Sequence, residues 1–131
     1  MGTHSTISIK REIGTIISIY CHWDGHLEGV GATLLTYYNT PEVIEHLISL
    51  GSVSSLGSNI EPFNPMSHSF NNPEENTTVF YSRDRGEPLR ITYYDSFDEW
   101  IKADGEGYDY LFTDGVWVYK DHGSFVGGLI K

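Results

Sequence analysis

The fold of this chain is decided by TISIKREIGTIISIYC, residues 6–21. In Thr6–Lys10 isoleucines alternate with polar residues, which is the period of a strand that buries one face. Thr15–Cys21 is rich in β-branched residues, and Arg11–Gly14 between the two segments has the composition of a turn. The stretch therefore predicts an antiparallel hairpin.

Two helices are predicted after this hairpin. Glu28–Tyr38 has apolar residues at helical spacing, although its two glycines weaken the first turn. The second helix begins at Thr40-Pro41-Glu42, because threonine can cap a helix and proline suits its first position. Gly51 is placed to end it.

The middle of the chain predicts a long loop and a second hairpin. Ser52–Asn76 is rich in Ser, Asn, Pro and Gly without a sustained period, and loops of that length are often functional. Thr77–Ser82 and Leu89–Tyr94 are expected as two strands joined by a turn at Arg83–Pro88.

The C-terminal third predicts one short helix and a third hairpin. Ser96 with Glu99 forms a capping box for the helix. Asp114-Gly115 predicts a tight turn between strands Tyr108–Phe112 and Val116–Tyr119, and the Gly-rich tail after Asp121 is expected to be loosely held.

The order ββ-αα-ββ-α-ββ predicts a single α+β domain over residues 1–131. Short connections favour antiparallel pairing, so we expect a twisted antiparallel sheet of about six strands with the helices packed on one face.

The balance of charges limits the classes of partner. With 18 acidic against 8 basic residues the net charge is -10, which disfavours direct nucleic-acid binding. Such a charge suits a nucleic-acid mimic or a protein that docks on a basic partner, or it simply keeps the protein soluble. No apolar run approaches the ~20 residues of a membrane span. A lone Cys21 and the lack of a signal segment predict a cytoplasmic protein.

A first cluster lies in Cys21–His26. His22, Asp24 and His26 would point to one side of an extended segment and could hold zinc or manganese, with His68 or Asp84 completing the site. A turn at the glycine inside the cluster would instead scatter these side chains and leave them solvated. The pattern assigns no catalytic residue, metal or cofactor.

A second cluster, Arg83–Arg90, holds three of the eight basic residues. Guanidinium groups suit phosphate or carboxylate, so the cluster could bind an external anion, while Asp84 and Glu87 offer local salt bridges instead. Ser67-His68-Ser69 lacks the third group that a catalytic Ser-His pair needs, and it fits ligand contacts better. The acidic, aromatic segment Asp95–Asp121 could be either an interface or an ordinary strand pattern.

Blocks spread from Ile7 to about Tyr119 carry a resemblance. They are Ile19–Gly25 (IYCHWDG), Gly29–Gly31 (GVG), Leu34-Leu35, Ser54–Gly57 (SSLG), His68–Phe70 (HSF), Tyr81, Arg83–Glu87 (RDRGE), Tyr110–Phe112 (YLF), Asp114-Gly115 and Trp117. Together they resemble a family of small uncharacterised proteins found in bacteriophages and prophages. The resemblance implies a phage setting but no mechanism, and it directs attention to the blocks around His22 and Arg85.

Small phage accessory proteins commonly act by binding, so we expect a counter-defence-like binder of an anionic, nucleotide-type small molecule rather than an enzyme. Arginines would hold its phosphates and an aromatic ring would stack on its base. The expected ligand-binding residues are Arg83, Arg85, Arg90, His22, Trp23, Asp24, His68 and Tyr81. One alternative is an acidic inhibitor of a host defence complex, such as an anti-CRISPR or a nucleic-acid mimic, acting through Asp95–Asp121. Another is a metal-dependent phosphoester hydrolase.

Overall fold

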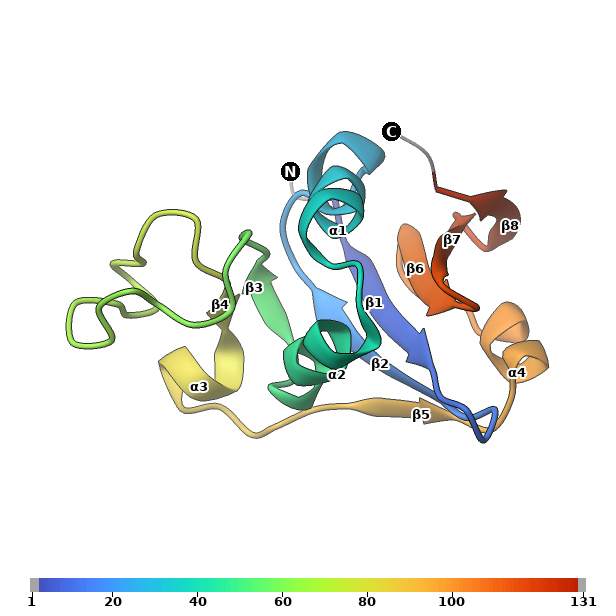
Figure 1. Cartoon of the computed structure of the whole chain (residues 1–131), viewed down its shortest axis with the longest axis horizontal. Coiled ribbons are helices and arrows are strands. Elements are labelled where there is room, and N and C mark those ends of the chain that lie inside the picture. The colour runs from blue at the N-terminus through green and yellow to red at the C-terminus, as the bar shows by residue number, and fades with distance from the viewer. Residues whose placement is uncertain (1–2, 130–131) are drawn as a thin grey trace.

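A computed structural model describes residues 3–129 as a mixed sheet of eight strands accompanied by short helices (Figure 1). The elements in chain order are β1 (Ser5–Lys10), β2 (Ile16–Cys21), the π-helical η1 (Leu27–Gly31), α1 (Ala32–Tyr37), α2 (Pro41–Ser49), β3 (Val53–Ser55), β4 (Val79–Phe80), α3 (Tyr81–Arg85), β5 (Thr92–Tyr94), α4 (Phe97–Lys102), β6 (Tyr108–Thr113), β7 (Val116–Asp121) and β8 (Ser124–Gly128). None of the helices within residues 3–129 has the length and apolar character needed to cross a membrane.

The sheet is ordered β4-β3-β2-β1-β6-β7-β8, and β5 pairs with β2 outside this path. The first hairpin is confirmed, with Ile7 opposite Ile19 and Ile9 opposite Ile17. The α+β class is confirmed, but the sheet has eight strands where about six were expected, and it is mostly rather than entirely antiparallel, because β1 pairs with β6 and β2 with β3 in parallel. Parallel pairs need long connections, which here contain the helices and the long loop.

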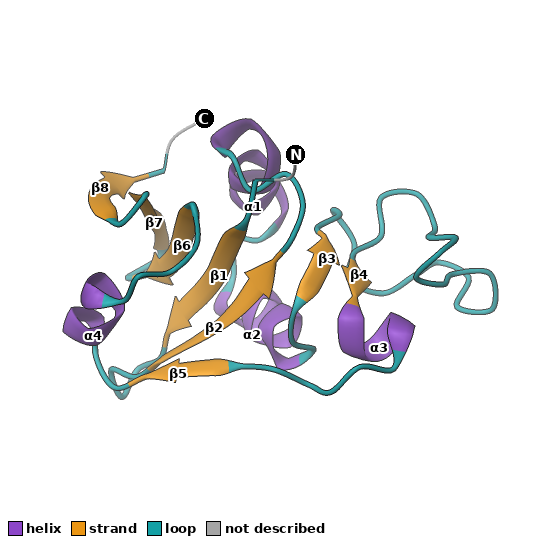
Figure 2. Ribbon diagram, turned by 180° about the vertical axis from the view of Figure 1, so that it is seen from behind, coloured by secondary structure: helices purple, strands orange, loops and turns teal. Residues whose placement is uncertain are grey.

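Helices cover both faces of the sheet, and the expectation that all lie on one face is wrong. The first face packs the β1 and β2 isoleucines against α1 and α2, through Leu34, Ile44, Leu47 and Ile48. These two helices lie in front of the sheet in Figure 1 and behind it in Figure 2. The second face packs Ile16 and Leu111 against Trp100 of α4. Neighbouring residues of a strand point to opposite faces, so Ile16 and Ile17 serve different cores.

The second predicted hairpin does not form. After β4 the chain turns at once into α3, which ends at Gly86 in a left-handed conformation (φ 77°). The Asp84 carboxylate accepts a hydrogen bond of 2.8 Å from the backbone N–H of Phe80, just before the helix, and so favours a helical turn over a strand. β5 therefore pairs with β2 instead of β4. A further short strand, β3, lies inside the expected loop 52–76.

The C-terminal hairpin is confirmed, and the chain beyond it is more ordered than expected. Asp114 and Gly115 both have positive φ, of 52° and 81°, as a two-residue turn between β6 and β7 requires. His122 and Gly123 repeat this geometry, with φ of 48° and 87°. The tail thus returns as β8 on the outer side of β7, which corrects the expectation of a loosely held tail for residues 122–129; the last two residues lie outside the described part of the chain.

Lys120 of β7 anchors α4 to the second face. It is buried, and its Nζ donates hydrogen bonds to the carbonyl oxygens of Trp100 (2.7 Å) and Ala103 (3.0 Å). Nζ also lies 4.6 Å from the centre of the Trp100 ring. Burial lowers the pKa of Lys120, and the charges of Asp109 and Asp104 partly oppose that shift. The ammonium group therefore supplies a donor to the Ala103 carbonyl and a second donor to the Trp100 carbonyl, which also accepts from the backbone N–H of Ala103 at 3.3 Å.

Replacing Lys120 with methionine should lower the free energy of unfolding by about 2 kcal/mol, because buried carbonyl groups lose their donor while the apolar volume is kept. Urea denaturation followed by circular dichroism measures this change. Lys102→Met on the exposed side of the same helix is the matched control and should change stability by less than about 0.5 kcal/mol. Equal losses in the two variants would contradict the anchoring role.

Candidate functional site

Arg83 holds the long loop against β4 and α3. Its guanidinium donates to the carbonyl oxygens of Ile60 (2.7 Å) and Thr78 (2.9 Å), and to the carboxylate of Asp84, with 3.0 Å between Nε and Oδ1. The same group lies over the Phe80 ring at 4.7 Å from its centre. The hydrogen-bond donors of Arg83 are therefore used by carbonyl and carboxylate groups of its own chain.

His68 joins the same network from the loop side. The His68 and Asp84 side chains are only 2% and 6% exposed, and Nε2 lies 3.2 Å from Oδ2 of Asp84. The backbone N–H of Glu74 donates to Nδ1 at 3.0 Å, so the ring hydrogen sits on Nε2 and is donated to Asp84. Nη2 of Arg83 is 3.4 Å from Nε2, but two donors face each other there and do not form a hydrogen bond. Both ring nitrogens of His68 are therefore engaged.

Asp84 is the acceptor at the centre of this network. Burial on its own would raise the pKa of Asp84, but hydrogen bonds from Arg83, the Phe80 amide and His68, together with the Arg83 charge, outweigh it and lower the pKa. The carboxylate therefore stays ionised at neutral pH and fixes the loop to α3.

Arg85 stands outside the network and faces solvent. Its side chain is 55% exposed, its Nε lies 3.1 Å from an oxygen of Glu87, itself 42% exposed, and its Cζ lies 4.9 Å from the centre of the Phe70 ring. A hollow of about 420 Å³ opens beside it, lined by Ser69, Phe70, Asn71, Asp84 and Arg85. A neighbouring hollow of about 350 Å³ is lined by Glu61, Pro62, Pro65, His68, Ser69, Arg83 and Asp84.

Aromatic side chains lie beside the Arg85 hollow and at the ends of β1 and β2, and together we call them the aromatic strip. Its members are Phe70, Tyr81, Tyr20, His22, His4 and Trp23. The ring centres of Phe70 and Tyr81 are 5.6 Å apart. Burial, Glu106 and the nearby Tyr81 hydroxyl raise the pKa of Tyr20. Ring contacts join Phe70 to Tyr81 and, separately, the other four members to one another, so the strip consists of one group beside the Arg85 hollow and one at the edge of the first hairpin.

The far end of the strip is built on His22. The Tyr20 hydroxyl lies 2.7 Å from Nδ1 of His22, the His4 ring stacks on His22 at 4.7 Å, and Trp23 meets it edge-on at 4.8 Å. Trp23 is exposed, but it lines neither hollow. His4 lies beside His22 because the hairpin register sets Ser5 opposite Cys21.

The structure brings together only some of the residues expected from sequence. Tyr81 and Arg85 both contact Phe70, while His68 and Arg83 lie beneath them in the buried network. Asp24 is exposed in a turn with φ of 57°. Arg90 is also exposed, and its backbone packs against Gly51 at the end of α2, so it lines neither hollow.

A metal site does not take shape around His22, Asp24 and His26. The left-handed turn at Asp24 separates the two histidines, as a glycine-containing turn predicts. Within residues 3–129 no three His, Cys, Asp or Glu side chains come together so as to hold a metal ion.

Sequence reasoning left three contributors out of the expected site: Phe70, Tyr20 and His4. Tyr20 and His22 lie two residues apart along an extended stretch and so share a face, a signal that was present in the sequence. His4 follows from the hairpin register, which could have been extended by one residue. Phe70 lies in a loop without a period, and the signal that marked it was its place in the HSF block, two residues after the expected His68.

No protein-family model, curated protein or solved structure shows significant similarity to this chain. The site is therefore interpreted from its own geometry.

Asp84→Asn should lower the free energy of unfolding by about 2 kcal/mol at pH 7, because Arg83 and His68 lose an ionised acceptor. The folded-state pKa of Asp84 lies below the unfolded value of about 3.9, so its contribution is present above about pH 4 and is lost as the pH falls through the folded-state pKa. Urea unfolding of wild type and variant at pH 7 and at steps down to pH 2 tests both points. Glu87→Gln, a change of the same kind at an exposed carboxylate, should have little effect on the free energy of unfolding. If the difference in free energy of unfolding between wild type and Asp84→Asn stayed constant down to pH 2, the stabilisation would not depend on ionised Asp84.

Cys21 should behave as an inert core thiol. It is fully buried, and burial raises its pKa to about 12. At pH 8 the thiolate is then on the order of 10³-fold scarcer than in an unfolded chain with a pKa near 8.5. A colorimetric thiol reagent should label the native protein slower by at least that factor than the protein in urea. Fast native labelling would show that the core around β2 opens readily.

Proposed function

We propose that the protein acts by binding, and that its ligand is an anionic small molecule of the nucleotide type, held at the Arg85 hollow. The observation that carries the proposal is the half-exposed Arg85 guanidinium, which lies against Phe70 at the rim of a hollow of about 420 Å³. That volume lies within the range of about 300–1,000 Å³ found for small-molecule sites.

An anionic ligand can replace the internal partner of Arg85 at low cost. Ion pairs between exposed side chains such as Arg85 and Glu87 contribute about 1 kcal/mol or less. A phosphate can accept two parallel hydrogen bonds from a guanidinium and binds it more strongly than a mobile carboxylate does. Arg83 cannot exchange partners in this way, because its donors are held by Asp84 and by two backbone carbonyls. Its role in this proposal is to hold the floor of the hollow in place.

The base of such a ligand would stack on the near end of the aromatic strip. Phe70 and Tyr81 lie next to each other there, with a tilt of 42° between their rings. Stacking of a base on an aromatic side chain contributes about 1–3 kcal/mol. Asn71 and Ser69 line the same hollow and offer hydrogen bonds to polar edges of the ligand.

Two features support binding over catalysis. Both ring nitrogens of His68, the imidazole that lines the adjacent hollow, are engaged in fixed hydrogen bonds. Cys21 is buried with a raised pKa, so it does not supply a thiolate. The resemblance to phage and prophage proteins supports a counter-defence setting, in which the captured molecule would be a nucleotide-type immune signal of the host cell.

Titration calorimetry and thermal shift with a panel of cyclic mono- and dinucleotides, ATP and inorganic phosphate test this proposal. At least one nucleotide should release heat and raise the melting temperature. Arg85→Ala should weaken that binding by at least about tenfold, which corresponds to about 1.4 kcal/mol. Phe70→Ala should weaken the binding of nucleotides but not the binding of inorganic phosphate.

Arg11→Ala is the matched control, because Arg11 is a similarly exposed arginine paired with Glu45 of α2 and lines neither hollow of the candidate site. It should leave nucleotide binding unchanged. A panel that gives neither heat nor stabilisation would overturn the proposal, and so would equal losses in Arg85→Ala and Arg11→Ala.

A further inference from the structure

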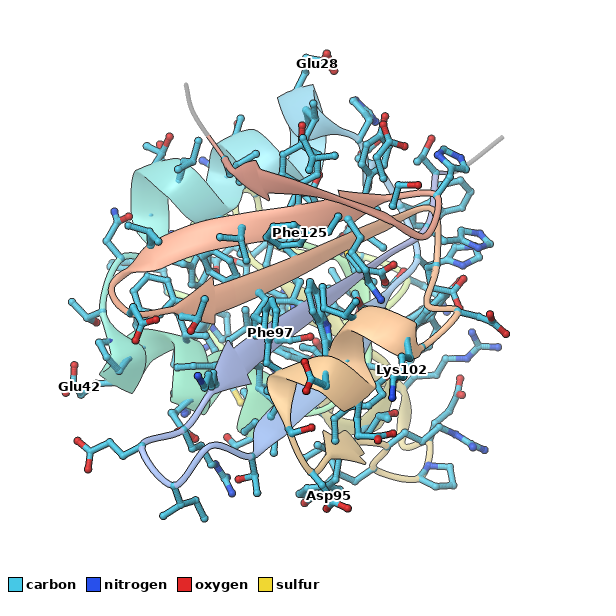
Figure 3. All side chains as sticks on the ribbon, turned by 90° about the vertical axis from the view of Figure 1, so that its right-hand side faces the viewer. Glu28, Glu42, Asp95, Phe97, Lys102 and Phe125 are labelled. Carbon is cyan, nitrogen blue, oxygen red and sulfur yellow. The ribbon has the colours of Figure 1, made fainter. Side chains whose placement is uncertain are left out.

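We propose a second binding surface, separate from the Arg85 hollow, that docks a basic protein through one large apolar side chain of the partner. We call it the α4–β8 surface, and Figure 3 shows it face on. Its apolar centre is formed by Phe97 and Phe125, and its exposed acidic side chains are Asp95, Asp98, Glu99 and Asp114.

Two phenylalanines form the centre of this surface. Phe97 of α4 and Phe125 of β8 meet edge to face, with 5.9 Å between ring centres and 84° between ring planes. Phe125 remains 47% exposed, and its neighbour Val126 is exposed as well. In Figure 3 both phenylalanines lie in the middle of the face that β7, β8 and α4 present. Exposed apolar side chains grouped on one face mark sites of protein interaction.

A small hollow beside the phenylalanines limits what can occupy the surface. Its volume is about 260 Å³, and it is lined by Lys10, Phe97, Thr113, Asp114, Val118 and Phe125. This is below the range of about 300–1,000 Å³ typical of small-molecule sites. It suits a single inserted side chain, which is how anchor residues bind at protein interfaces.

β8 adds an open edge to this surface. It is the last strand of the sheet on this side, so only its β7 side is paired within residues 3–129. Edge strands that carry exposed apolar residues readily take part in intermolecular contacts. The short length of β8 and the positive φ of Gly127 (121°) limit regular strand pairing, which leaves side-chain docking as the main mode.

Charge identifies the partner as basic. Asp95, Asp98 and Glu99 stand at the start of α4, and Asp114 borders the hollow. Among residues 3–129, Lys10 at the hollow, Lys102 on α4 and the buried Lys120 carry three positive charges against these four acidic residues. The chain as a whole carries -10, so its field attracts a cationic surface and repels a second copy. An apolar centre with an acidic rim therefore fits a partner that surrounds one large apolar side chain with lysine or arginine.

A nuclear magnetic resonance titration of the ¹⁵N-labelled full chain tests this inference. The probes are two synthetic lysine-rich peptides of equal charge, one with a central tryptophan and one with serine at that position. The tryptophan peptide should shift resonances of α4 and β8 and bind at least about tenfold more tightly than the serine peptide. Phe125→Ala should remove this preference while the spectrum stays that of a folded protein.

Two pairs of substitutions separate local from overall charge. Asp98→Asn with Glu99→Gln neutralises the rim, whereas Glu28→Gln with Glu75→Gln makes the same change in net charge at exposed sites outside the surface. The rim pair should weaken the binding of the tryptophan peptide by about fivefold, and the loss should be larger at low salt than at high salt. The other pair should have little effect on this binding.

Equal weakening by the two pairs, equal binding of the two peptides, or shifts located away from α4 and β8 would overturn the inference. A dimer in analytical ultracentrifugation that Phe125→Ala converts to monomer would also overturn it, since the occupant would then be a second copy. Arg85→Ala should leave peptide binding intact, so failure of this inference and failure of nucleotide capture are distinguishable.

Discussion

The parallel pairing of β1 with β6 is the interaction on which the rest of the structure depends. Five residue pairs, from Ser5 with Tyr108 to Ile9 with Phe112, join the N-terminal hairpin to the C-terminal strands. The Thr6 hydroxyl donates a partly buried hydrogen bond of 2.6 Å to Oδ1 of Asp109, which links positions 103 residues apart in the sequence. Because this ladder lies between two cores, α1 and α2 pack on one face while α4 packs on the other. The pairing thereby leaves β4 and α3 at one end of the strand order and β8 at the other, with a candidate binding surface beside each (Figure 1).

Burial divides the few cations of this acidic chain into two roles. Arg83 and Lys120 donate to backbone carbonyls, and each lies close to an aromatic ring. Both therefore hold segments of the chain together inside the molecule. Arg85, only two residues from Arg83, is exposed, and among the described residues its carboxylate partner is Glu87, which is exposed in its turn. The difference does not lie in residue type but in how many fixed acceptors surround each group, since a guanidinium held by several buried acceptors is costly to release.

The Asp84 network connects fold and candidate function. Through His68 and Arg83 it ties the loop before β4 to the short helix after it, and so sets Phe70 against Arg85 and Tyr81. A five-residue helix and an irregular loop have little stability of their own, so the position of the hollow depends on these few buried polar contacts. The α4–β8 surface depends in the same way on Lys120, which holds α4 against β7.

The sequence by itself determined the elements whose signals are local. The hairpin 6–21, the caps at Thr40 and Ser96 and the turn at Asp114-Gly115 each rest on residues within a few positions of one another. Only the tertiary structure decided the parallel pairing of β1 with β6, the placement of α4 on the second face and the return of the tail as β8. It also decided that Arg83 is held by internal hydrogen bonds while Arg85 remains exposed, which the sequence RDRGE by itself could not distinguish. These outcomes depend on contacts between residues far apart in the chain. The energy of such contacts depends on how the whole domain packs, so no local sequence pattern can predict it.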